Sequence, residues 1–222
     1  MIKRRVKACE AISCKRVIDG VHIWRAALDE DGWPSAEELP SEDRQRAESF
    51  LRRGPARRWV AARWALRQAL AQYLDQPARE IGLELDERNK PRLHERGGGL
   101  QFNLSHSAGL ALVAVTERRA VGIDVEAIAP RENLAELAER ALPAEEAAAV
   151  RAADPGQRLT AFYGAWARHE ARLKCLGTGF GLAPPGAGTA IAMIEVDPAY
   201  AAAVAVAGSE MGPLHCRTLR AG

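Results

Sequence analysis

Residues 101–126 contain the feature that most constrains the fold, because short apolar runs there end in polar and acidic motifs. Alternation and length predict strands at 102–104, 110–115 and 121–125. The link at 117–120 has the length of a hairpin connection, and we expect one half of the chain to end there and the other to begin. The remaining elements are placed around this segment.

The same succession of strand, helices and strands is predicted on both sides of that link. Before it, a strand at 20–28 precedes a helix with Ser41 as its N-cap, and Gly54-Pro55 separates that helix from a second one at 56–74. After it, the expected helices span 132–140, 144–153 and 157–176, and the expected strands span 191–196, 202–207 and 214–219. Helices segregated from mostly antiparallel strands indicate an α+β fold.

The composition is that of an ordinary globular protein. The formal net charge is +2, and no apolar run approaches the roughly 20 residues of a membrane span, so we expect neither nucleic-acid nor membrane partners. The basic N-terminus has no apolar segment of signal-peptide length, which predicts a cytoplasmic protein. Four cysteines without metal-type spacing predict reduced thiols: Cys9, Cys14, Cys175 and Cys216.

Two carboxylates stand two residues apart on the strand at 121–125 and its continuation. Side chains alternate along a strand, so Asp124 and Glu126 project from one face while Ile123 and Val125 point into the core. Such a pair repels unless a cation lies between, and Mg2+ takes carboxylate oxygens together with phosphate oxygens and water. The alternative is an edge strand with solvated acids.

The helix at 157–176 carries a second group of candidate residues. Trp166, Glu170 and Lys174 are four residues apart and share one stripe of the helix. An acid beside a buried aromatic stripe needs a partner, which Lys174 or a metal would provide. The alternative is an ordinary Glu-to-Lys helix pair. His169 lies about 100° around the helix from Glu170 and need not share the site.

Other candidates are basic or lie in turns. His106, between Ser105 and Ser107 at a strand end, can donate to a phosphate oxygen or transfer protons, although an ordinary hydrogen-bonded turn histidine fits as well. Pro91 predicts a turn at 89–93, which contains Lys90. The helix at 56–74 bears arginines that either face solvent or grip a phosphate: Arg57, Arg58, Arg63 and Arg67. Together these residues describe a site for a phosphorylated substrate held by Mg2+.

With these motifs in view, the chain resembles the 4'-phosphopantetheinyl transferases of the surfactin-synthetase-activating type. The matching segments are RRWVAARWALRQALAQYL (57–74), NKPRL (89–93), FNLSHSAGLALVAV (102–115), VGIDVE (121–126), WARHEARLKCLGTGFGLAPP (166–185) and VDPAYAAAVAV (196–206). They occur in the family's order and cover most of residues 20–207. The combination is far more specific than any one motif.

The resemblance implies transfer of the phosphopantetheine arm of coenzyme A to a serine of an apo acyl or peptidyl carrier protein, with release of adenosine 3',5'-bisphosphate. It implies that Mg2+ is bound by three acids: Asp124, Glu126 and Glu170. It implies that the pyrophosphate is held by Ser105, His106 and Lys174, and the 3'-phosphate by Arg58 and Lys90. Glu170 is also the candidate base for the carrier serine, although a carboxylate bound to metal is a poorer base.

The family fold is a pseudo-dimer of two similar α+β halves with the site in the cleft between them. This agrees with the repeated pattern and implies an N-terminal half at 1–118 and a C-terminal half at 119–222 that carries the metal ligands. Two fused halves also remove the need for a second subunit, so we expect a monomer. The resemblance does not indicate which carrier or pathway is served.

The chain departs from the family pattern at two positions. His169 replaces the lysine that usually precedes the helix glutamate, and Asn89 replaces the glycine of a G-K-P turn. The first change leaves open a second hypothesis, a coenzyme A-binding protein without transferase activity. A Mg2+-dependent phosphohydrolase would share the carboxylates but gives no reason for Arg58 and Lys90.

Overall fold

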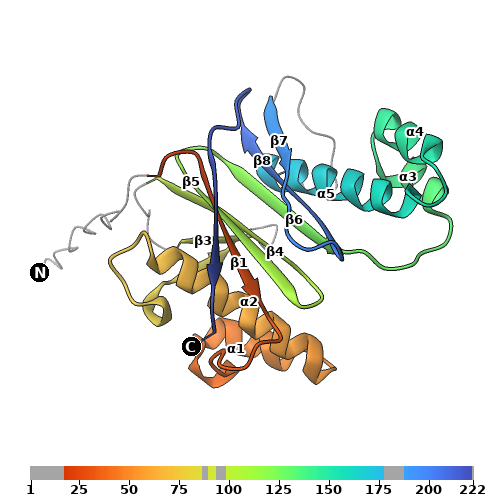
Figure 1. Ribbon diagram of the computed structural model, residues 1–222. Helices are drawn as coiled ribbons and strands as arrows, with labels where there is room; N and C mark the ends of the chain where they lie inside the picture. The colour runs from red at the N-terminus through yellow and green to blue at the C-terminus, as the bar shows by residue number, and fades with distance from the viewer. Residues whose placement is uncertain (1–17, 87–89, 94–98, 178–187, 222) are drawn as a thin grey trace, which may run out of the picture.

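A computed structural model describes residues 18–86, 90–93, 99–177 and 188–221 (Figure 1). The helices are α1 (Ser41–Glu48), α2 (Arg53–Ala71), α3 (Leu134–Ala141), α4 (Ala144–Ala152) and α5 (Arg158–Leu176), with 3-10 turns η1 (Ala36–Glu38) and η2 (Ala78–Glu80). The strands are β1 (Val21–Ala27), β2 (Leu83–Leu85), β3 (Pro91–Leu93), β4 (Leu100–Ser107), β5 (Leu110–Glu117), β6 (Val121–Ala127), β7 (Thr189–Met193), β8 (Tyr200–Ala207) and β9 (Leu214–Leu219).

Two larger sheets and two long helices form the body of the protein. One sheet has the order β4-β5-β1-β9 and the other β6-β8-β7. One face of the first sheet packs on α2 through a core that includes Trp24, Leu66 and Val113. Its other face meets the second sheet, and α5 covers the far side of that second sheet (Figure 1). The α+β prediction is confirmed, and each half repeats the arrangement of a helix on a sheet.

Alternating side chains along β6 explain this layering. Ile123 and Val125 point into the apolar layer between the two sheets, and Asp124 points to the side covered by α5. β8 is buried on both faces, and its small residues, such as Ala203 and Ala205, let α5 lie close to the sheet. The acids of β6 therefore face α5, where Glu170 and Lys174 are.

The chain is less simply divided than the repeated pattern indicated. The link at 118–120 does not close a hairpin, because β5 pairs with β1 and β4 while β6 pairs with β8 in the other sheet. Arg118 has a φ of 61° there, in the left-handed region that suits a sharp change of direction. β9 returns to the first sheet and pairs parallel to β1. The division into residues 1–118 and 119–222 remains a proposal.

Several local predictions differ from the structure. α2 begins at Arg53, so Gly54 and Pro55 lie in its first turn. A backbone N–H there has no intrahelical partner, so the N–H that proline lacks is not missed. Pro40 rather than Ser41 is the N-cap of α1. Pro91 starts the edge strand β3 instead of a turn. Asn89, Cys9 and Cys14 lie outside the described residues. Among the described cysteines, Cys175 and Cys216 are free thiols, as expected.

The arginines of α2 do not form one solvated face. Arg63 and Arg67 are buried and both bind Asp43 of α1, at 2.8 Å and 2.6 Å. Arg57 is exposed and pairs with Asp31. None of the helices in the described part of the chain is long and apolar enough to cross a membrane.

The contact between β6 and α5 leaves no room for a side chain at Gly122. A Cβ there would lie 2.1 Å from the carbonyl oxygen of Ala171 and 2.3 Å from the backbone nitrogen of Cys175. Gly122→Ala should therefore separate the strand from the helix and lower the free energy of unfolding by about 1–3 kcal/mol or more. Urea unfolding checks this, with the exposed Gly156, which has open space around it, changed to alanine as the control. Equal stability of the two variants would contradict the packing.

Candidate functional site

Polar side chains of β4 join the two sheets at their edges. Alternate residues of β4 accept hydrogen bonds from alternate backbone N–H groups of β6: Ile123 N to Asn103 Oδ1 at 2.9 Å, Val125 N to Ser105 Oγ at 3.3 Å, and Ala127 N to Ser107 Oγ at 3.1 Å. The spacing of two on both strands follows from strand alternation. These side chains fix the position of β6 relative to β4, which places the acids of β6 beside the serines of β4.

The two serine hydroxyls also donate to the acids. Ser105 donates to Asp124 Oδ1 at 2.9 Å, and Ser107 donates to Glu126 Oε2 at 3.1 Å. Each hydroxyl thus accepts from the backbone of β6 and donates to a carboxylate of β6. Asn103 and Ser107 have no role predicted from the sequence. Their signal was the row of polar residues at every second position of a strand, which shows that this face does not pack on an apolar core.

Lys174, on α5, contacts Asp124 and Ser105. Its Nζ donates to Asp124 Oδ1 at 2.5 Å and to Ser105 Oγ at 3.1 Å. Lys90, also predicted as a site residue, donates from its Nζ to the main-chain oxygen of Lys174 at 3.1 Å. Burial lowers the pKa of Lys90. The structure therefore brings residues from β4, β6, α5 and the segment before β3 to one place.

Asp124, Glu126 and Glu170 act on one another electrostatically. Burial raises the pKa of Glu126, and the charge of Asp124 raises it further. Burial also raises the pKa of Glu170, with the charges of Asp124 and Glu126 adding to the shift and that of Lys174 opposing it. We refer to these three acids, whose charges act on one another, as the acid cluster.

Two carboxylate oxygens of the cluster are buried without a hydrogen-bond partner among the described residues: Asp124 Oδ2 and Glu170 Oε1. Buried acceptors of this kind are normally satisfied, and an oxygen-binding cation would satisfy them. The described residues hold no ready-made group of three acidic, histidine or cysteine ligands around one point. The oxygen donors fit Mg2+, but in the free protein Lys174 lies against Asp124.

Ser105 and His106 point to opposite faces of β4, as neighbours on a strand must. Phe102 and Leu104, which share the face of His106, pack in the core formed with α2. His106 is solvent-exposed by surface area, yet the surrounding protein desolvates it and lowers its pKa, and the charge of Lys174 lowers it further. His106 therefore lies on the other face of β4 from the acid cluster, although the charge of Lys174 acts on it.

Arg58 forms its ion pair with Asp29 and not with an acid of the acid cluster. Its Nε and Nη2 donate to the two carboxylate oxygens of Asp29 at 2.8 Å and 2.7 Å. Asp29 in turn lies against the turn that follows β4, because a Cβ on Gly109 would be 2.7 Å from Asp29 Oδ2. Any anion bound by Arg58 would have to share the guanidinium with Asp29.

The charges that act on His169 do not come from the acid cluster. Burial lowers the pKa of this histidine, and the charges that act on it come from Glu146 of α4 and from Arg172. The helix geometry that predicted a separate position for His169 is therefore consistent with the structure.

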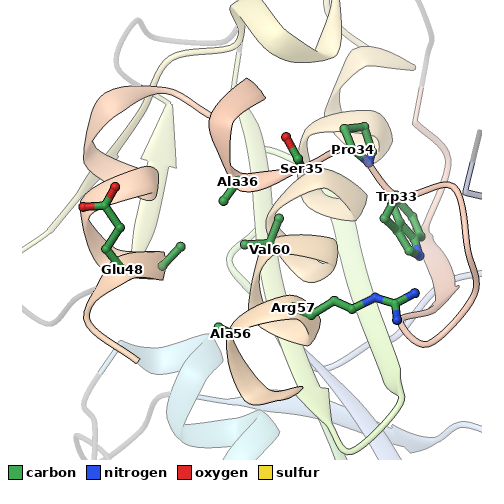
Figure 2. Close-up of a pocket in the computed structure, with 9 residues that line it drawn as sticks. Trp33, Pro34, Ser35, Ala36, Glu48, Ala56, Arg57 and Val60 are labelled. Carbon is green, nitrogen blue, oxygen red and sulfur yellow. The ribbon is translucent and has the colours of Figure 1, made fainter. Parts of the chain in front are cut away.

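A pocket of about 390 Å³ lies between η1, α1 and α2 (Figure 2). Its walls are largely apolar, with Arg57 and Glu48 as the charged residues. The residues that line it are Trp33, Pro34, Ser35, Ala36, Ala47, Glu48, Ala56, Arg57 and Val60. Of the arginines named from the sequence, Arg57 is in this set, but the residues assigned to the metal, the pyrophosphate and the 3'-phosphate are not.

The lowered pKa of His106 predicts a specific pH dependence of stability. Below the ordinary value of 6.5 the unfolded chain binds more protons at this position than the folded protein does. The free energy of unfolding should therefore fall as the pH drops from 6.5 toward the lowered pKa. His106→Gln should show a smaller fall in urea unfolding between about pH 7.5 and about pH 5. If the free energy of unfolding of the variant depended on pH as that of the wild type does, the lowered pKa of His106 would be contradicted.

Comparison with known proteins gives the same family in both halves of the chain. A family described as the 4'-phosphopantetheinyl transferase superfamily matches residues 120–215, and one described as 4'-phosphopantetheinyl transferase, N-terminal, matches residues 24–118. The 4'-phosphopantetheinyl transferase HetI of Nostoc sp. is 37% identical over 166 residues, which cover 72% of this chain and 70% of that protein. The 4'-phosphopantetheinyl transferase AcpT of Salmonella typhimurium is 32% identical over 180 residues, which cover 81% and 83%.

Proposed function

Because this chain belongs to the 4'-phosphopantetheinyl transferase superfamily, we propose that the cluster of Asp124, Glu126 and Glu170 is its active site. The chain is an enzyme of this class and transfers phosphopantetheine from coenzyme A to carrier proteins. We further propose that it is of the surfactin-synthetase-activating type and depends on Mg2+. We also propose that it is a cytoplasmic monomer. The observation that carries the site is the pair of buried, unpartnered oxygens on Asp124 and Glu170 within the described residues.

Mg2+ fits this cluster because all three candidate ligands offer carboxylate oxygens. Asp124, Glu126 and Glu170 would hold it, and when bound it would supply positive charge close to the phosphates of coenzyme A. Ser105 and Ser107 orient the first two acids through the hydrogen bonds described above. Orientation by such partners strengthens a metal site.

The chain's own residues then have distinct roles in the transfer. The serine oxygen of the carrier forms a bond to the β-phosphorus of coenzyme A while the bond to the adenosine 3',5'-bisphosphate leaving group breaks. Glu170 is the candidate acceptor for the serine proton, a role that competes with binding the metal. Lys174 stabilises the negative charge on the leaving group.

For the remaining phosphate contacts we propose Ser105 and His106 at the pyrophosphate, and Arg58 and Lys90 at the 3'-phosphate. The contact of Ser105 with Lys174 supports the role of Ser105, and the contact of the half-buried Lys90 ammonium with the main chain at Lys174 supports the role of Lys90. His106 is near enough for the charge of Lys174 to act on it. Arg58 has guanidinium N–H groups beyond the two that bind Asp29, and these can reach an anion.

The alternative, a coenzyme A-binding protein without transferase activity, depended on His169 and is not favoured. The charges that act on His169 are those of Glu146 and Arg172, not those of the acid cluster or Lys174. The relatives of this chain are also named as transferases.

Incubation with coenzyme A, Mg2+ and apo carrier proteins tests the proposed function. Mass spectrometry of the carrier should show the gain of one phosphopantetheine group. When a chelator replaces Mg2+, the mass of the carrier should stay unchanged. Acyl and peptidyl carriers should be compared in parallel, because the site geometry does not select between them. An unmodified carrier in every case would contradict the proposal.

A further inference from the structure

Lys174 occupies the position where the acid cluster needs positive charge. Its Nζ lies 2.5 Å from Asp124 Oδ1, and the side chain of Asp124 is only 3% exposed. The same ammonium donates to Ser105, which is itself bonded to Asp124. A buried carboxylate is costly without such a partner, so Lys174 stabilises Asp124 in the free protein.

The other two acids also experience the charge of Lys174. It favours the ionised forms of Glu126 and Glu170, against the burial that disfavours them. One ammonium therefore serves three carboxylates. Because Asp124 Oδ2 and Glu170 Oε1 have no partner among the residues that the structure describes, this neutralisation is incomplete.

A divalent cation at Asp124 would lie close to the ammonium of Lys174, and like charges at that separation repel. Both would use the carboxylate of Asp124. The side chain of Lys174 can leave without unfolding α5, since it is 29% exposed and sits on a flexible four-carbon stem. Its main-chain oxygen meanwhile remains bonded to Lys90.

We propose that Lys174 is an internal counter-cation, which holds Asp124 in the free protein and is released when a divalent cation binds the acid cluster. Release makes its ammonium available to an anionic ligand, so binding of the metal and of coenzyme A are coupled through Lys174. The coupling to coenzyme A rests on the proposed function. The competition between Lys174 and the metal does not, and is tested without coenzyme A.

The test is calorimetric titration of Mn2+ onto the full chain without coenzyme A. Lys174→Met and Lys174→Gln remove the competing charge and should bind Mn2+ about tenfold more tightly than the wild type, or better. Lys90→Met is the matched control, because it removes a nearby half-buried ammonium that contacts a main-chain oxygen rather than the acids. It should change the affinity for Mn2+ by less than about threefold. Equal or weaker binding by both Lys174 variants would overturn the proposal.

Loss of Lys174 also leaves Asp124 without its ammonium, so the variants are expected to melt at lower temperature. Addition of Mn2+ should then raise the melting temperature of Lys174→Met by more than it raises that of the wild type. A smaller or equal rise would contradict competition, even for a destabilised variant.

Repeating the titration with coenzyme A present measures the coupling. Coenzyme A should tighten binding of Mn2+ by a larger factor in the wild type than in Lys174→Met. If coenzyme A tightened Mn2+ binding by the same factor in both proteins, Lys174 would not be the coupling residue. If the Mn2+ titrations contradict these expectations while the wild type still modifies carriers, only the counter-cation role of Lys174 is rejected. If the wild type modifies no carrier, the proposed function is rejected.

Discussion

Asp124→Asn is expected to reduce transfer of phosphopantetheine to the carrier by about 10²–10³-fold, the range found when one preorganised electrostatic group is removed from an active site. Asparagine keeps the size of the side chain but removes the negative charge at the centre of the acid cluster. It also removes the partner of Lys174. The measurement is the rate of carrier modification with saturating coenzyme A and Mg2+.

Glu145→Gln provides the matched control, since it removes the charge of an exposed acid on α4. Its rate should equal that of the wild type. Circular dichroism establishes that both variants are folded. A folded Asp124→Asn protein with the wild-type rate would show that the acid cluster is not the catalytic site.

The largest effect on stability is expected at Asp43, far from the acid cluster in sequence. Asp43 is 7% exposed and binds two buried guanidinium groups, those of Arg63 and Arg67. Asp43→Asn leaves both cations in the interior without their counter-ion. Breaking a buried ion pair from one side should lower the free energy of unfolding by about 3–5 kcal/mol, measured by urea denaturation.

Asp31→Asn is the control for that experiment, because it breaks an aspartate–arginine pair at the surface. The carboxylate of Asp31 is fully exposed, and its pair with Arg57 is solvated. Its loss should leave the urea midpoint unchanged within error. Comparable losses in the two variants would contradict the structural importance of the α1–α2 ion-pair network.

The sequence predicted the elements best where one periodicity dominates. The helix at 157–176 was confirmed with a one-residue difference at its start, and Gly177 ends it in the left-handed conformation. The face shared by Asp124 and Glu126 followed from strand alternation, and their contact with α5 brings Glu170 and Lys174 to them. These features depend on local spacing, which a sequence displays directly.

Features that depend on distant pairing were not predictable in the same way. The parallel pairing of β9 with β1 joins segments almost the whole chain apart, and no local pattern specifies it. The hydrogen bonds from β6 to Asn103 and Ser107 depend on how two sheet edges meet. The burial of Arg63 and Arg67 likewise required the position of Asp43, because the periodicity of α2 alone is compatible with exposed arginines.

The proposed metal site is tested most directly by counting bound Mn2+ ions by electron paramagnetic resonance. In the presence of coenzyme A, the wild type should bind Mn2+ at the acid cluster, and Asp124→Asn and Glu170→Gln should each lose that ion. Glu145→Gln should retain it. Wild-type Mn2+ stoichiometry and affinity in both cluster variants would contradict the assignment of Asp124 and Glu170 as the cation site of this transferase.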